Sequence, residues 1–66
     1  MDKKQAAQEI VGLRKTTQMT QKAFAEAFDI PVRTLQNWEE GINAPNRYTK
    51  RCLTEHVNRW LNEKNK

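Results

Sequence analysis

The chain has 66 residues, with 12 Lys or Arg against 8 Asp or Glu, so its formal charge is +4 and its pI is about 9.6. Only 36% of these residues are apolar, and small chains bury a modest share of their surface, so we expect one domain over residues 1–66 without a deep substrate pocket. The single Cys52 excludes an internal disulfide, and neither it nor His56 has neighbours at zinc-ligand spacing, so we expect no metal and no cofactor. Glu39 and Glu40 have no acid or base partner in the sequence, and we therefore expect that the chain is not an enzyme.

Targeting signals are absent from the sequence, and its charge is uneven. The N-terminus lacks the apolar stretch of a signal peptide, and no apolar run approaches the roughly 18 residues that a membrane span needs. This pattern predicts a soluble cytoplasmic protein with no membrane contact. Residues 1–30 carry five bases and four acids, whereas residues 31–66 carry seven bases and four acids. The excess favours a polyanionic partner, although a charge of +4 is also common in ordinary domains.

The spacing of apolar residues predicts four helices and no strand. The first helix is expected over about residues 3–16, where Ile10 and Leu13 fall on one face. Thr20 is of the type that caps a helix N-terminus, and it precedes a second short helix over about residues 21–28.

A third helix is expected over about residues 32–40. Pro31 cannot continue the second helix but can open the third with its fixed φ, and Gly41 is a typical residue at a helix C-terminus. Three apolar residues fall on one side of this helix: Leu35, Trp38 and Ile42.

The last helix is predicted over about residues 46–63, after Asn43-Ala44-Pro45. One continuous stripe marks its inner side: Thr49, Cys52, Leu53, His56, Val57, Trp60 and Leu61. We interpret Cys52 as a small buried hydrophobe and His56 as a packed or edge histidine. An alternative role for Trp38 and Trp60, as platforms that stack on single-stranded bases, is disfavoured because both keep helical spacing with apolar neighbours.

Two short helices joined by Asp29-Ile30-Pro31 have the sequence form of a helix-turn-helix. In such a turn the small Ala25 allows the second helix to approach closely, and Asp29 tolerates a left-handed backbone better than most residues. The side of the third helix opposite its apolar residues then faces outward. It carries side chains that can hydrogen bond to base edges in a major groove: Arg33, Gln36 and Asn37.

These residues resemble the Cro/phage-repressor type (XRE) helix-turn-helix family over about residues 6–62. The resemblance rests on Leu13-Arg14, Met19-Thr20-Gln21, Phe24-Ala25, Ile30-Pro31, Thr34-Leu35, Trp38-Glu39-Glu40-Gly41 and Pro45. The set is specific, although each piece alone is weak. It implies an all-α, lambda-repressor-like bundle of about four helices, with the helix-turn-helix at about residues 20–41. It also implies sequence-specific binding of double-stranded DNA by a bacterial or phage transcriptional regulator, typically a repressor that occupies an operator.

The resemblance also implies roles for individual residues. A structural ion pair is expected between Arg14 and Glu39. The residues expected to contact bases are Val32, Arg33, Gln36 and Asn37. The residues expected to contact phosphates are Gln21, Thr34, Arg47 and Lys50, the last two because they follow the turn after the recognition helix. Two residues depart from the family pattern, since Asp29 stands at the usual glycine and Pro31 at the usual capping Ser or Thr.

The sequence leaves alternatives open for the oligomeric state and the partners of the chain. One recognition helix reads only a few base pairs, so we expect a symmetric homodimer, formed through the last helix and stabilised on DNA. In the alternative, Trp60 and Leu61 fold back onto Ile10 and Leu13 and leave a monomer that needs a protein partner. A protein-interaction module or antitoxin-like partner with weak or no DNA binding is the rival function, and a fragment of a longer regulator is a third possibility.

Overall fold

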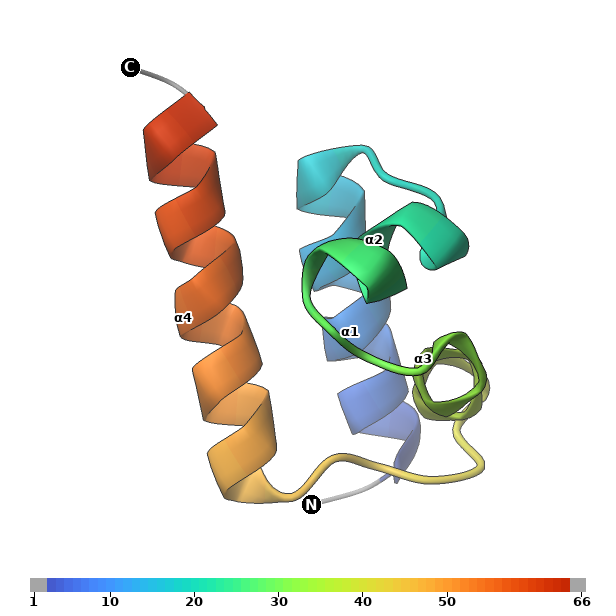
Figure 1. Cartoon of the computed structure of the whole chain (residues 1–66). Helices are drawn as coiled ribbons and strands as arrows, with labels where there is room; N and C mark the ends of the chain where they lie inside the picture. The colour runs from blue at the N-terminus through green and yellow to red at the C-terminus, as the bar shows by residue number, and fades with distance from the viewer. Residues whose placement is uncertain (1–2, 65–66) are drawn as a thin grey trace.

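The computed structural model describes residues 3–64, which form four helices and contain no strand (Figure 1). Their bounds are α1 (Lys3–Thr17), α2 (Gln21–Ala27), α3 (Val32–Glu40) and α4 (Arg47–Lys64). The predicted all-α fold and the four predicted helices are confirmed, with ends that differ by at most one residue. Within residues 3–64, no helix is both long enough and apolar enough to cross a membrane.

Each helix contributes at least one fully buried side chain to a single core. The largest of these side chains are Ile10, Phe24, Leu35 and Val57, all no more than 1% exposed. The Phe24 ring also packs against Phe28, with centroids 4.8 Å apart. Because every helix supplies one core residue and the chain is short, no helix can be removed without opening the core.

The ends of α2 and α3 are set by local signals that the sequence shows. The Thr20 hydroxyl accepts a hydrogen bond from the Ala23 N–H at 3.1 Å, which confirms it as the N-cap of α2. Asp29 has φ 56°, so the predicted left-handed residue of the turn is confirmed. Gly41 ends α3 with φ 79°, a conformation that costs glycine least. Ala25 is only 1% exposed, and its carbonyl accepts a hydrogen bond from the Ile30 N–H at 2.8 Å, which closes the turn.

The last helix stands apart from the helix-turn-helix. Figure 1 shows α4 beside α1, with a space between α4 and the α2–α3 half of the molecule. No Cα atom of α4 lies within 8 Å of a Cα atom of α2 or α3. Side chains from both sides therefore bridge this space or line it.

Ile42, on the apolar side of the predicted third helix, is 56% exposed, because the left-handed turn at Gly41 directs the chain away from the core. The expected burial of Cys52 is wrong, since Cys52 is only partly buried, and His56 is exposed. The reason is the rotation of α4, which directs Leu53 and Val57 toward the core and leaves the adjacent Cys52 and His56 toward the space beside α2 and α3.

Candidate nucleic-acid interface

Helix α3 has one buried side and one open side. Leu35 is fully buried, and Trp38 packs partly buried against the same core. The open side carries Val32, Arg33, Gln36 and Asn37. Val32 is 40% exposed, Arg33 and Gln36 are exposed, and Asn37 is partly buried. All four residues predicted to contact bases therefore lie on the side of α3 that faces away from the core.

The chemistry of this open side suits base edges. A guanidinium can donate two hydrogen bonds to guanine, a carboxamide can both donate to and accept from adenine, and an isopropyl group can contact a thymine methyl. Because α3 is held by Leu35 and Trp38, these side chains would be presented on a rigid element.

Arg14 and Glu39 form a two-pronged ion pair between α1 and α3. Arg14 Nε donates to Glu39 Oε2 at 2.8 Å, and Arg14 Nη2 donates to Glu39 Oε1 at 3.0 Å. The side chains are 19% and 5% exposed, respectively. The hydrogen bond to Glu39 raises the pKa of Arg14 above its ordinary value. Arg14 Nη1 also donates to the Met19 carbonyl at 3.0 Å, so one side chain holds α1, the following loop and α3 together.

Gln21, the first residue of α2, also joins this pair. Its Nε2 donates to Glu39 Oε1 at 3.1 Å, and the side chain is partly buried. A carboxamide nitrogen carries two N–H donors, so one donor remains for a phosphate. The phosphate role of Gln21 therefore stays a prediction. Sequence reasoning missed its bond to Glu39, because nothing in the sequence indicates a contact between residues 18 positions apart.

The other predicted phosphate contacts lie in different surroundings. Arg47 is exposed at the start of α4, where the Asn46 side chain accepts a hydrogen bond from the Thr49 N–H at 2.7 Å. Lys50 forms an ion pair with Glu9 of α1, so its ammonium is already partly neutralised within the fold. Thr34 is partly buried and lies on the side of α3 that faces α4. Arg47 is thus the most accessible of the three for DNA.

The comparison with known families decides which class of protein carries this site. Residues 10–49 match the model of a helix-turn-helix family. The chain belongs to the Cro/C1-type (XRE) helix-turn-helix family. The match runs from within α1 through α2 and α3 to the start of α4. Neither a curated protein nor a solved structure matches the chain. Membership indicates a double-stranded DNA-binding regulator of the XRE type, from a family that binds DNA rather than catalysing a reaction.

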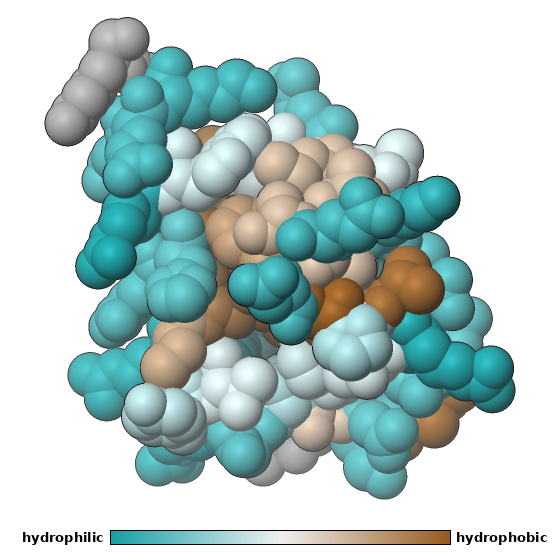
Figure 2. Space-filling view, in the orientation of Figure 1, coloured by the Kyte–Doolittle hydropathy of each residue, from teal (hydrophilic) through white to brown (hydrophobic). Residues whose placement is uncertain are grey.

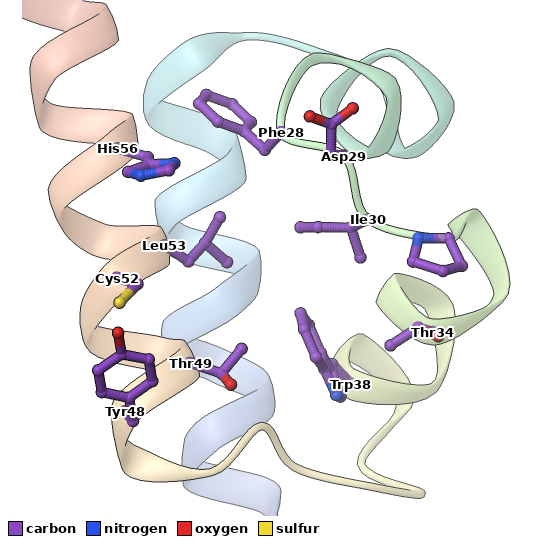
Figure 3. A pocket seen from close by; sticks show the side chains of 11 residues that line it. Phe28, Asp29, Ile30, Thr34, Trp38, Tyr48, Thr49, Cys52, Leu53 and His56 are labelled. Atoms are coloured by element: carbon purple, nitrogen blue, oxygen red, sulfur yellow. The ribbon is translucent and has the colours of Figure 1, made fainter.

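Most of α4 lies outside the residues that match the XRE family, and one side of it borders a groove. This α4 groove has a volume of about 380 Å³ and runs between α4 and the α2–α3 turn. Its walls are lined by Phe28, Ile30, Trp38, Tyr48, Cys52, Leu53 and His56, together with Asp29, Pro31, Thr34 and Thr49. Figure 3 shows Ile30 and Trp38 pointing toward α4, and Leu53 pointing back toward them. Figure 2 shows the apolar surface here, between hydrophilic residues on either side.

Tyr48 is the most exposed large hydrophobic side chain described in this XRE-family chain, at 77%. It stands on α4 one turn before Cys52, as Figure 3 shows. A hydrogen bond to the Cys52 side chain raises the pKa of Tyr48 above its ordinary value. Sequence reasoning did not single out Tyr48, although its spacing of four residues from Cys52 could have placed it on the same side of the helix.

Proposed function

We propose that the chain is a transcriptional repressor that recognises a specific operator through α3 and acts by occupying it in the cytoplasm of a bacterial or phage-infected cell. The observation that supports this proposal is the open side of α3, where Arg33, Gln36 and Asn37 stand within a helix-turn-helix that matches the XRE family. In this arrangement α2 crosses the DNA backbone and α3 enters the major groove. Binding, without chemical change of the DNA, is then the whole mechanism.

The roles of the side chains follow from their donors and acceptors. Arg33 suits a guanine, Gln36 and Asn37 suit adenines, and Val32 suits a thymine methyl. Arg47 is proposed as the main phosphate contact. Gln21 and Lys50 are proposed as weaker ones because both are bonded within the fold, and Thr34 because it is partly buried on the side of α3 that faces α4. Phosphate contacts fix the position of the protein, and base contacts select the sequence.

Two copies are needed for a useful degree of selectivity. One α3 reaches only a few base pairs, which is too little information to find one operator in a genome. We therefore propose a homodimer whose two α3 helices enter successive major grooves, roughly 34 Å apart along the DNA. The operator would then carry two related half-sites in opposite orientation.

Selection of binding sites from random double-stranded DNA tests the function directly. We expect a symmetric consensus with two half-sites about one helical turn apart. Affinity for the selected site should fall steeply with salt, because displaced counterions oppose binding at high salt. Failure to enrich any sequence, together with no salt-dependent DNA binding, would contradict the proposal and favour a protein-interaction or antitoxin-like role. Arg33→Ala is the variant for comparison, since it removes a proposed base contact on α3 without touching the core.

A further inference from the structure

The α4 groove differs in charge from the rest of the molecule. The chain has a net charge of +4, and α4 alone carries five basic residues. None of the described residues that line the groove is a Lys or an Arg, whereas one of them, Asp29, is acidic. The basic residues of α4 stand on its other sides, where Arg47, Lys50 and Arg51 border a separate hollow. The groove is therefore a site without cationic side chains in a cationic protein.

The carboxylate at the edge of the groove is positioned by the turn between α2 and α3. Asp29 is exposed and has the left-handed φ of 56°. The next residue, Ile30, donates its N–H to the Ala25 carbonyl at 2.8 Å, which fixes the backbone of the turn. No ion pair within residues 3–64 uses the Asp29 carboxylate. A negative charge without a bonded cation therefore stands at this edge.

Three aromatic side chains line the same groove. Figure 3 shows Phe28 near Asp29 toward one end, and Trp38 and Tyr48 toward the other, with Ile30 between them. Phe28 and Trp38 are partly buried, and Tyr48 is 77% exposed, so each ring keeps some surface that a ligand can reach. The faces of aromatic rings carry partial negative charge and attract cations. The rings and the carboxylate therefore favour the same sign of ligand charge.

We propose that the α4 groove is a binding site for a small organic cation. Its ammonium group lies beside Asp29 and Phe28, and its apolar or aromatic body extends past Ile30 toward Trp38 and Tyr48. The charge complementarity of the groove carries the proposal, because an anionic ligand of the same shape would be repelled by Asp29 and would find no basic partner among the lining residues. The site goes beyond the proposed DNA binding and does not depend on it.

The size of the groove supports a small molecule as the occupant. Its volume of about 380 Å³ lies within the range of roughly 300–1,000 Å³ that is typical of small-molecule sites. The part of α4 that borders it, from Tyr48 to His56, is only about 12 Å long. A stable protein–protein interface buries about 800 Å² on each partner, which is more than a groove of this length offers.

A ligand in the groove would touch two parts of the fold that have no close backbone contact. No Cα atom of α4 lies within 8 Å of a Cα atom of α2 or α3. The cation would contact Asp29 and Ile30 of the turn and Trp38 of α3 on one wall, and Tyr48 and Leu53 of α4 on the other. Because these contacts exist only in the folded chain, the ligand should raise the temperature of thermal unfolding.

Titration with three compounds of one shape and different charge tests the site. The probes are naphthylmethylammonium, the neutral naphthylmethanol and the anionic naphthylacetate, each followed by NMR spectra of the backbone amides of the whole chain. We expect the cation to bind about fivefold more tightly than the neutral compound, a factor that an exposed ion pair can supply. The anion should bind most weakly. The amide signals that shift should be those of the groove, around Asp29, Trp38 and Cys52.

Asp29→Asn tests the role of the carboxylate. Asn tolerates the left-handed backbone as Asp does, so this variant should fold like the wild type. It should lower the affinity for the cation to about that for the neutral compound, and leave the neutral compound unaffected. Glu26→Gln is the matched control, because Glu26 is an exposed acidic residue nearby that does not line the groove. Tyr48→Ala should weaken the cation and the neutral compound alike.

Four results would overturn the proposal. The first is no shift of the groove signals at about 10 mM cation, a concentration that would reveal even very weak binding. The second is a cation that binds no better than the anion, and the third is an affinity for the cation that Asp29→Asn and Glu26→Gln change equally. The fourth is a shift of the groove signals with protein concentration alone, which would show that a second copy of the chain occupies the groove.

Discussion

Arg14 and Glu39 lie 25 residues apart in the sequence, and their side chains meet through two hydrogen bonds of 2.8 and 3.0 Å. The pair fixes α3, which carries the proposed recognition surface, to α1, which contributes Ile10 to the core. The Glu39 carboxylate also accepts from Gln21, so the start of α2 is held by the same group. One carboxylate therefore sets the relative positions of three helices.

Removing Arg14 should destabilise the fold strongly. Glu39 is 5% exposed, so Arg14→Ala leaves a nearly buried carboxylate with only the Gln21 amide as a partner. We expect a loss of about 3 kcal/mol in the free energy of unfolding, because an unpaired buried charge is costly. Urea denaturation measures it. Arg33→Ala, on the open side of α3, should change the same free energy by less than about 0.5 kcal/mol. Equal stability of Arg14→Ala and the wild type would contradict the role of the pair.

The same substitution at the two glycines should have opposite effects. Gly12 lies within α1 with open space around an added Cβ, so Gly12→Ala should stabilise the fold by about 0.5–1 kcal/mol through helix propensity. Gly41 also has open space but has φ +79°, so Gly41→Ala should destabilise it by about 1 kcal/mol through backbone strain alone. Thermal unfolding of the two variants measures both effects. If both substitutions stabilised the fold, or both destabilised it, the backbone conformations at Gly12 and Gly41 would not explain the changes in stability.

The helices could be predicted because their signals are local. Thr20, Asp29 and Gly41 act on their own backbone or on residues within one turn, and such effects are readable from sequence. The helix-turn-helix could be predicted for the same reason. The family could be inferred from the larger set of residues that resemble the XRE pattern.

The position of α4 could not be predicted, because its sequence offers two adjacent apolar ridges. One ridge runs through Cys52 and the other through Leu53, which is the next residue in the sequence. The single stripe predicted for this helix includes residues of both ridges. Which line packs on α1 depends on how α4 is rotated, a property of the assembled core. Of the two residues that the alternative arrangement folds back onto the first helix, Leu61 packs against the core. Trp60 does not, and it lies beneath the Lys64 ammonium, 4.8 Å from the ring centroid.

The proposed base contacts could be placed on one side of α3 from helical periodicity, but their surroundings could not. The bond between Gln21 and Glu39 and the ion pair between Lys50 and Glu9 depend on side-chain positions across helix boundaries. Both bonds involve residues predicted to contact phosphates. These contacts within the fold therefore show which of the residues predicted to contact phosphates are already bonded, and residue type alone does not show this.

The ionisation of Tyr48 should report its contact with Cys52. Tyr48 is the sole tyrosine, so the tyrosinate absorbance follows one group. The hydrogen bond to Cys52 raises the pKa of Tyr48 above its ordinary value of 10.0, so the titration midpoint should lie above that value. Cys52→Ala removes the hydrogen bond and should lower the midpoint. Ile42→Ala, outside α4, should leave it unchanged, and a midpoint that Cys52→Ala does not move would contradict the contact.

The two kinds of proposed DNA contact should separate by their dependence on sequence and salt. Arg33→Ala removes the α3 guanidinium, and we expect it to weaken binding to the selected site by about 1–3 kcal/mol and to relax the preference at one base pair. Arg47→Ala removes an exposed cation at the start of α4, so it should weaken binding to every sequence alike and reduce the salt slope by about 0.9 for each phosphate that is no longer neutralised. Fluorescence anisotropy with the selected site and with random DNA, over a series of salt concentrations, measures both effects. Both variants keep the core and the pair of Arg14 with Glu39, so their stabilities should match that of the wild type. If Arg33→Ala lowered the affinities for selected and random DNA equally, Arg33 would be a phosphate contact, and base selection would have to come from the other side chains on the open side of α3.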